Sequence, residues 1–185
     1  MKKYLLLFAL FLSVFLSLAV RAQERAQKDF SFVFMTDVHI RPDTPVLRKF
    51  NETVETINRL EVDFVISGGD QVFDVMRGNV AKSDTLFTLF SEYASRIRVP
   101  VYKTVGNHEL FGIYPESDVD STHADYKYGM FERYFGKTYY SFDHKGCHFI
   151  VLNVLDVQNK RYIGKVGKEQ LAWLKADLAK VDPRT

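Results

Sequence analysis

Three short apolar runs, separated by amphipathic segments, restrict the possible folds of this chain more than any other feature. Residues 30–35, 64–66 and 101–105 are mostly apolar or β-branched, which is typical of strands, and we expect the first two to be buried. Apolar residues recur at helical spacing over residues 44–60 and 83–97, which predicts an amphipathic helix after each of the first two strands. This strand-helix-strand-helix-strand order predicts an α/β fold with right-handed crossovers and a parallel sheet.

Local signals suggest where the two helices begin. Thr44 is followed by Pro45, which fits an N-cap with proline at the first helical position. Ser83 or Asp84 can cap the second helix, because short polar side chains accept hydrogen bonds from the free amides of a first helical turn.

The second half of the chain contains fewer regular patterns. Residues 139–143 and 148–152 flank a Lys145-Gly146 turn, which predicts a β-hairpin. Apolar residues at helical spacing over residues 168–181 predict a last helix. Residues 111–138 form a long stretch that we expect to be irregular, and loops of this length are often functional.

The first 22 residues have the pattern of a secretory signal peptide. Lys2 and Lys3 precede an apolar run over residues 4–20, and small residues lead to a predicted cleavage site after Ala22. We therefore expect residues 1–22 to be removed and the rest of the chain to be exported, either to a periplasm or as a secreted protein. The alternative is an uncleaved membrane anchor, because a run of this length lies at the lower limit for crossing a bilayer.

The charge balance argues against a nucleic-acid-binding surface. The chain has 25 basic and 23 acidic residues, but the predicted leader holds three of the basic residues and no acidic one. The chain after the leader is therefore slightly acidic, and we expect no nucleic-acid-binding patch. The single cysteine excludes a disulfide scaffold and a cysteine-rich metal site.

Polar side chains follow each of the three predicted strands. Asp37 and His39 follow the first strand, Asp70 follows the second, and Asn107 and His108 follow the third. Ligands bind outside the carboxyl ends of the strands in open α/β sheets, so we expect these side chains to converge. Converging carboxylates repel each other unless a cation lies between them. Oxygen and imidazole ligands without thiolate suit Mn, Fe or Zn.

The three motifs occur in a fixed order: Asp37-x-His39, Gly69-Asp70 and Gly106-Asn107-His108-Glu109. Together they resemble the calcineurin-like metallophosphoesterases, and the similarity covers essentially the whole chain after the leader. The resemblance implies a four-layer α-β-β-α sandwich with two divalent or trivalent metal ions at the strand ends. It also implies hydrolysis of phosphate monoesters or diesters by a hydroxide held between the two ions.

The resemblance implies a role for each of five residues. Asp37 and His39 would bind the first metal ion. Asp70 would bridge both ions, and Asn107 would bind the second. His108 would face the substrate as the catalytic residue, where it could stabilise the transition state or protonate the leaving group. The identity of the metals, Mn, Fe or Zn, stays open.

Residues next to the motifs argue against two subgroups of this family. Phe73 stands where the similar purple acid phosphatases carry a tyrosine ligand, and the segment that starts there lacks the Asp-Arg-Gly of Ser/Thr protein phosphatases. The nearest match is the broad exported group, whose substrates vary. Asp74 is a candidate to orient His108, and we expect Glu109 to fix its loop by hydrogen bonding rather than to act in catalysis.

The family's remaining histidine ligands do not occur in their expected context. The resemblance implies a lone histidine and then Gly-His-x-His, whereas His123, His144 and His148 lie outside any such motif. We therefore expect residues 23–185 to be the N-terminal part of a longer catalytic domain, truncated at its C-terminus. Alone, this part is expected to bind at most one metal ion weakly and to be inactive.

Two functions from different classes remain. The first is an exported phosphoesterase that acts on a small-molecule or macromolecular phosphate ester and meets a membrane only through an uncleaved leader. The alternative is a non-catalytic binding or scaffold protein on the same fold. A nucleotide-binding Rossmann module is disfavoured because no Gly-x-Gly-x-x-Gly follows the first strand. The oligomeric state stays open.

Overall fold

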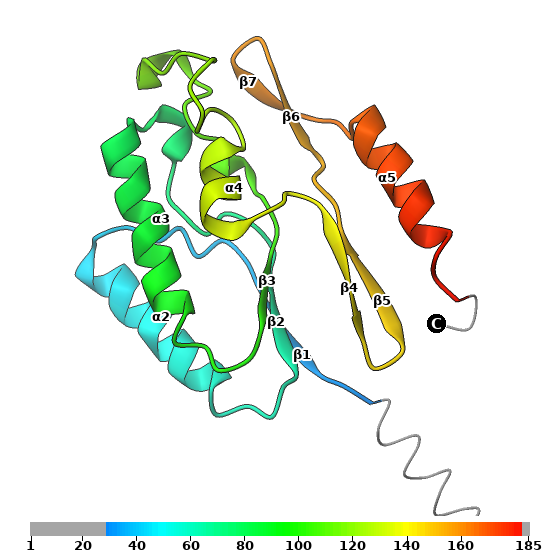
Figure 1. Cartoon of the computed structure of the whole chain (residues 1–185). Coiled ribbons are helices and arrows are strands. Elements are labelled where there is room, and N and C mark those ends of the chain that lie inside the picture. Colours follow the sequence, from blue (N-terminus) through cyan, green and yellow to red (C-terminus); the bar gives the residue numbers. More distant parts are fainter. Residues whose placement is uncertain (1–28, 183–185) are drawn as a thin grey trace, which may run out of the picture.

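The computed structural model describes residues 29–182 and contains the expected parallel sheet (Figure 1). Its strands are β1 (Phe32–Met35), β2 (Phe64–Ser67) and β3 (Val101–Lys103), in the order β1-β2-β3. Both neighbouring pairs are parallel, which confirms the predicted alternation of strands and helices. The predicted leader, residues 1–22, lies outside the described residues.

Two helices, α2 (Thr44–Ile57) and α3 (Val80–Ala94), cover one face of the sheet (Figure 1). Phe50 of α2 and Phe90 of α3 are buried and stack with ring centroids 5.5 Å apart. Burying a side chain of this size contributes about 2 kcal/mol. The apolar face of each helix, which the sequence pattern predicted, therefore holds the helices on the sheet.

Both helices begin earlier than their capping signals suggested. Asp43 precedes α2, and Thr44 is already helical. Asn79 caps α3, because its side-chain oxygen accepts a hydrogen bond from the Lys82 amide at 3.0 Å. The predicted cap near Ser83 was wrong, since Asn79 satisfies the first turn and leaves Ser83 buried inside the helix.

The predicted hairpin, β4 (Tyr140–His144) and β5 (Cys147–Val151), covers the opposite face of the sheet. Aromatic rings fill this interface. Tyr102 of β3 stacks on Phe142 with centroids 3.5 Å apart, and Phe64 of β2 meets the same ring edge-on at 5.6 Å. These contacts place the hairpin over β2 and β3, and Phe149 of β5 reaches Phe32 of β1 with ring centroids 6.5 Å apart.

The last helix, α5 (Lys168–Leu178), packs on the outer side of this hairpin (Figure 1). Trp173 contacts Tyr139 with centroids 5.0 Å apart, and His148 Nε2 lies 2.9 Å from the Asp177 carboxylate. The layers therefore run helices, sheet, hairpin, helix. This order confirms the predicted α-β-β-α sandwich.

The position of β1 corrects one expectation. Phe32 and Phe34 are 43% and 62% exposed, although the sequence predicted a buried strand. The reason is that β1 forms an edge of the sheet, where the hairpin meets Phe32 only edge-on, through Phe149 with ring centroids 6.5 Å apart. Val33 and Met35 point the other way and pack against the core below the helices.

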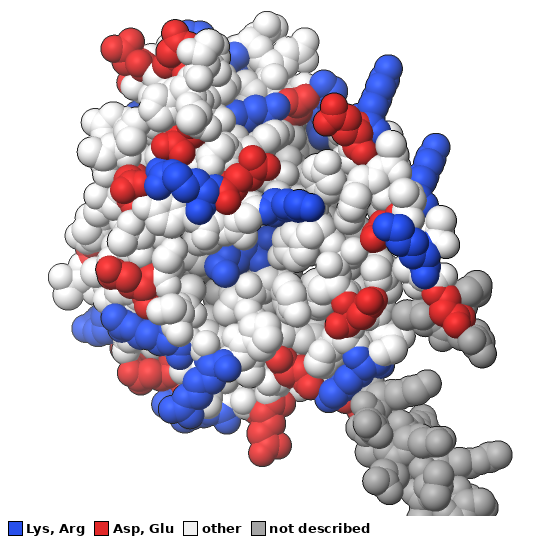
Figure 2. Space-filling view, viewed as in Figure 1, with Lys and Arg blue, Asp and Glu red and all other residues white. Residues whose placement is uncertain are grey.

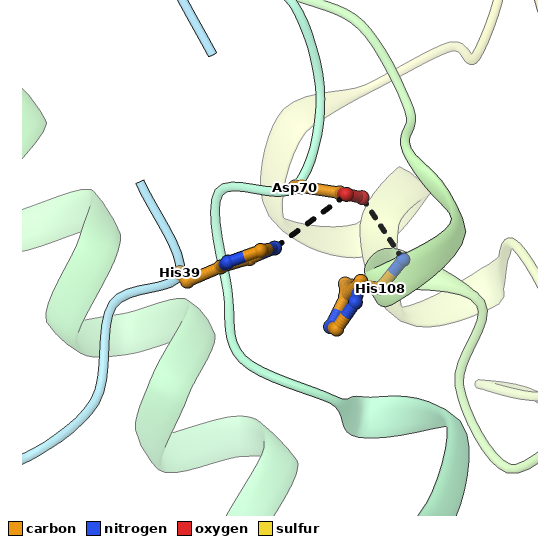
Figure 3. A group of neighbouring side chains, drawn as sticks. All are labelled: His39, Asp70 and His108. Atoms are coloured by element: carbon orange, nitrogen blue, oxygen red, sulfur yellow. Dashed lines mark hydrogen bonds and ion pairs between the residues drawn. The ribbon is translucent and has the colours of Figure 1, made fainter. Parts of the chain in front are cut away.

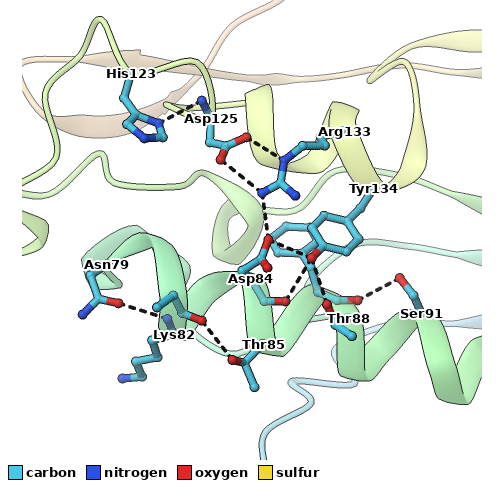
Figure 4. Close-up of polar contacts among 12 residues, drawn as sticks. Asn79, Lys82, Asp84, Thr85, Thr88, Ser91, His123, Asp125, Arg133 and Tyr134 are labelled. Atoms are coloured by element: carbon cyan, nitrogen blue, oxygen red, sulfur yellow. Dashed lines mark hydrogen bonds and ion pairs between the residues drawn. The ribbon is translucent and has the colours of Figure 1, made fainter.

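A short helix, α4 (Gly129–Phe135), lies within the stretch that was expected to be irregular. Isolated helices of this length are unstable in water, so tertiary contacts must hold it. Arg133 binds Asp84 of α3 at 2.8 Å and Asp125 at 2.9 Å, and the Tyr134 hydroxyl also contacts Asp84 at 2.8 Å (Figure 4). These contacts join the long connection to α3.

A second hairpin, β6 (Leu155–Gln158) and β7 (Arg161–Gly164), was also missed. Asn159 and Lys160 form its two-residue turn with φ values of 51° and 54°. Two positive φ values match a type I′ turn, whose usual sequence is Asn-Gly. Lysine in place of glycine hid this signal.

Basic and acidic side chains are interspersed over the face shown in Figure 2, which carries no continuous basic patch. Among residues 29–182, no helix combines the length and the apolar character needed to cross a bilayer.

Candidate metal centre

Backbone hydrogen bonds join the segments that follow β1 and β2. The Asp37 amide donates to the Gly69 carbonyl at 3.2 Å, and the His39 amide donates to the Asp70 carbonyl at 2.9 Å. The first two motifs therefore run side by side beyond the strand ends. This geometry confirms the expected convergence of these motifs.

Three of the predicted ligands have an unusual backbone conformation. Asp37, His39 and Asp70 have φ values of 56°, 47° and 52°, in the left-handed region. Non-glycine residues rarely adopt this region, and each instance costs about 1–3 kcal/mol. Such strain clusters at functional sites, because the surrounding structure fixes the direction of the side chain at the expense of the backbone.

Two glycines allow the second and third motifs to approach each other. Gly69 has a φ of 104°, and a Cβ atom there would lie 2.9 Å from the backbone N and Cα of Gly106. A Cβ atom on Gly106 would lie 2.2 Å from Asp70 Oδ1. Any larger residue at either position would therefore push the third motif away from Asp70.

One side chain from each motif points into a shared space (Figure 3). One ligand atom each of His39, Asp70 and His108 lies within 4.8 Å of the other two. The two imidazole centroids are 4.4 Å apart, and all three residues are partly exposed. The imidazole of His39 and the carboxylate of Asp70 are ligands that suit Mn, Fe or Zn.

The buried Nε2 atom of His39 shows that these residues fit a cation. It has no hydrogen-bond partner among the described residues and lies 3.5 Å from Asp70 Oδ2. Buried polar atoms are nearly always satisfied. A metal ion bound by the imidazole nitrogen and the carboxylate oxygen would satisfy both atoms.

The two carboxylate oxygens of Asp70 have different surroundings. Oδ1 accepts a hydrogen bond from the His108 amide at 3.1 Å, whereas Oδ2 faces His39. The carboxylate thus connects the first motif to the third. The bridging role expected for Asp70 stays a prediction.

His108 is held in one tautomer by the backbone of Asp74. The Asp74 amide donates to His108 Nδ1 at 2.9 Å, so the proton of the neutral ring lies on Nε2. Burial lowers the pKa of His108, and nearby His39 adds to this effect against the raising effect of the surrounding carboxylates. The Asp74 carboxylate itself binds Arg77 at 3.1 Å. Asp74 therefore orients the ring through its amide.

Glu109 is fully buried beneath the site and fixes the loops that carry it. Its Oε2 atom accepts hydrogen bonds from the amides of Asp70 and Gly106, at 2.9 Å and 2.8 Å, and its Oε1 accepts from Val72 at 3.1 Å. Burial raises the pKa of Glu109 to about 7, against the lowering effect of these amides. The side chain therefore joins the second motif to the third, as expected for a positioning residue.

The structure does not bring all five predicted residues into one cluster. Asp37 is exposed, and its carboxylate accepts a hydrogen bond from the Thr36 hydroxyl at 2.7 Å. It lies outside the group formed by His39, Asp70 and His108. Asn107 is half-buried and begins the short 3-10 helix Asn107–Glu109 that also carries His108.

The later histidines take part in contacts elsewhere. His144 lies 3.2 Å from Asp63, and His148 lies between two aspartates at 2.6 Å and 2.9 Å. His123 accepts an amide hydrogen bond within its own loop at 3.1 Å. None of the three belongs to the cluster of ligand atoms within the described residues.

Sequence reasoning gave no role to two arginines at the rim of the site. Arg41 lies over the Phe73 ring at 5.1 Å, and this ring is about 6 Å from both His39 and His108. Arg77 forms an ion pair with Asp74, whose backbone amide orients His108. The only feature of the sequence that could have indicated this position is that both arginines lie close to the motifs along the chain.

The sequence model of the calcineurin-like phosphoesterases matches residues 30–184. The chain belongs to this family. Membership agrees with the cluster of nitrogen and oxygen ligands, since this calcineurin-like phosphoesterase carries its metal-binding motifs at the ends of three parallel strands.

Two solved structures share the fold of this calcineurin-like phosphoesterase. A dimetal phosphatase from Danio rerio is 16% identical, with a TM-score of 0.55 over 84% of this chain and 66% of its own. A purple acid phosphatase from yellow lupin (Lupinus luteus) seeds is 19% identical, with a TM-score of 0.51 over 84% of this chain and 29% of its own. The chain thus spans less than two thirds of either structure. No curated protein sequence matches it.

Proposed function

We propose that this chain is the N-terminal part of an exported, dinuclear-metal phosphoesterase that hydrolyses phosphate monoesters or diesters. The observation that carries the proposal is the cluster of His39, Asp70 and His108, in which a buried imidazole nitrogen faces a carboxylate without a hydrogen bond. Family membership supports the reaction class.

In this proposal the metal ligands come from all three motifs. Asp37 and His39 would hold one ion. Asp70 would be shared between the two ions, and the Asn107 carbonyl oxygen would bind the second without adding charge. Bound metal ions of this kind lower the pKa of water and neutralise charge that develops on phosphate oxygens. Their identity, Mn, Fe or Zn, depends on geometry and supply.

His108 supplies a hydrogen-bond donor for the transition state. Its Nδ1 accepts from the Asp74 amide, so the neutral ring would direct its Nε2–H toward the oxygens of the ester, where negative charge develops. A positioned donor of this kind accelerates a reaction about 100-fold or more. Glu109 fixes the loops that carry Asp70 and His108 relative to each other.

The charge balance bears on how the substrate is attracted, and the leader bears on where the protein is located. The chain after the leader has 22 basic and 23 acidic residues, so bound cations rather than a basic surface draw in a phosphate ester of small or large size. Residues 1–22 direct export to a periplasm or to the outside, and a membrane is met only if this leader is retained.

The proposed centre is incomplete in this chain, because His144 and His148 are engaged elsewhere and no Gly-His-x-His is present. We expect at most one weakly bound metal ion and no turnover. Equilibrium dialysis with Mn²⁺ should show this ion in the wild type and in Asp118→Asn, an exposed control, but not in Asp70→Asn.

Two outcomes would contradict this proposal. Equal Mn²⁺ binding by wild type and Asp70→Asn would refute the role of Asp70. Two bound ions with full hydrolysis of p-nitrophenyl phosphate or bis(p-nitrophenyl) phosphate by this chain would refute its incompleteness. A longer form of the protein that binds no metal and cleaves neither ester would favour the scaffold alternative.

A further inference from the structure

Lys103 lies on the helix-covered side of the edge strand β3. Its neighbour Tyr102 faces the hairpin, where it stacks on Phe142, and side chains alternate between the two faces of a strand. Lys103 therefore points toward the ends of α3 and α4. There it lines a cavity of about 310 Å³, which we call the Lys103 pocket.

The charge of Lys103 is not balanced within the pocket. Among the described residues its amine forms no ion pair, and its contacts are the Val101 carbonyl at 3.3 Å and the Phe135 ring at 5.4 Å from the centroid. Burial lowers the pKa of this amine. Removing a charged group from water without a counter-ion is unfavourable. An anion that entered the pocket would therefore gain more from this lysine than from one on the open surface.

The rest of the lining selects the kind of anion. Besides Lys103 and Val101, the pocket is lined by five residues with apolar or aromatic side chains and by two serines. These residues are Ala94, Ile97, Val99, Tyr134, Phe135, Ser91 and Ser95. Both serine hydroxyls already donate to carbonyls of α3 at 2.8 Å, so they offer no further hydrogen to an anion. The C-terminal end of α3, which carries partial negative charge, also lies here and repels a doubly charged ligand more strongly than a singly charged one.

We propose that the Lys103 pocket binds a small apolar monocarboxylate, independently of the phosphoesterase chemistry. The carboxylate pairs with Lys103 Nζ, and the apolar body packs against Ile97 and Phe135. The single positive charge of Lys103 balances a monoanion, whereas a doubly charged phosphate would bring a second negative charge into a partly buried site with no cation to pair with it. A cavity of this size lies at the lower end of the range for small-molecule sites, which fits a ligand such as an aromatic acid.

Calorimetric titration of the full chain with benzoate tests the proposal. We expect saturable binding that weakens at least tenfold in Lys103→Met, which keeps the apolar stem, and stays unchanged in Lys137→Met, an exposed lysine. Benzamide, which has the same shape without charge, should not bind, and inorganic phosphate should not compete. Unchanged benzoate affinity in Lys103→Met, or no binding to the wild type, would overturn the proposal.

A measurement on the wild type avoids the case in which Lys103→Met fails to fold. Reductive methylation of lysines, mapped by mass spectrometry, should be slowed at Lys103 by benzoate and not by benzamide, while Lys137 reacts at the same rate throughout. Equal methylation of Lys103 with and without benzoate would also overturn the proposal.

Discussion

Replacing Gly69 by alanine tests whether the close approach of β2 and β3 builds the metal centre. Alanine at a φ of 104° is strained, which costs about 1–3 kcal/mol. The new Cβ atom would also lie 2.9 Å from the Gly106 backbone, and relieving such a contact costs about 1–3 kcal/mol more. We therefore expect Gly69→Ala to lower the free energy of unfolding by about 3 kcal/mol or more.

Urea unfolding followed by circular dichroism measures this change. Gly164→Ala is the matched control, because a Cβ atom there would have no neighbour within 4 Å. We expect that control to keep the wild-type midpoint. For a domain of this size the loss in Gly69→Ala corresponds to a fall in melting temperature of about 6–12 °C. Equal midpoints for Gly69→Ala and Gly164→Ala would refute the argument that β2 and β3 need this glycine.

Three further predictions concern other buried or charged groups. Glu109→Ala should lose about 3 kcal/mol of stability, because one buried and two partly buried amides lose their acceptor, whereas exposed Glu92→Ala should lose little. A loss below about 1 kcal/mol in urea unfolding would contradict this. Asp143 and Asp177 raise the pKa of His148 above 6.5, so its stabilising contribution is complete below pH 6.5 and disappears as the pH rises through the raised value. His148→Gln should therefore destabilise the chain more at pH 5.5 than at pH 9, and an equal effect at both pH values would argue against the ion pairs. Arg133→Gln should speed amide hydrogen exchange in α4 while changing global stability by less than about 1 kcal/mol, and unchanged exchange would show that α4 does not depend on this residue.

The parts of the fold that were predicted correctly depend on local patterns. The apolar spacing of α2 and α5 and the turn between β4 and β5 are visible in short windows, because each element buries one face. α4 and the β6-β7 hairpin have no such pattern. α4 depends on Arg133 contacts with residues far away in the sequence, and the β6-β7 turn uses lysine where glycine is usual.

Some features of the metal centre were likewise predictable from the sequence, and others depended on tertiary contacts. The order of the motifs after the three strands predicted that five side chains would converge, since parallel strands end at one edge of a sheet, and the structure groups His39, Asp70 and His108. The tautomer of His108 could not be predicted, because it depends on a backbone amide 34 residues away in the chain. The burial of Glu109 and its three amide partners also depend on packing between separate loops.

The sequence by itself determined the alternation of strands and helices and the order of the three motifs, because hydrophobic periodicity and motif order are properties of the linear chain. The four-layer order and the roles of the predicted ligands came from the resemblance that these motifs carry. Tertiary structure decided what surrounds each ligand: the unsatisfied His39 nitrogen, the two environments of the Asp70 oxygens and the exposure of β1. It also created the Lys103 pocket, where residues from β3, α3 and α4 meet around one charge. These features depend on distances between segments far apart in the chain, and such distances exist only after the layers have packed.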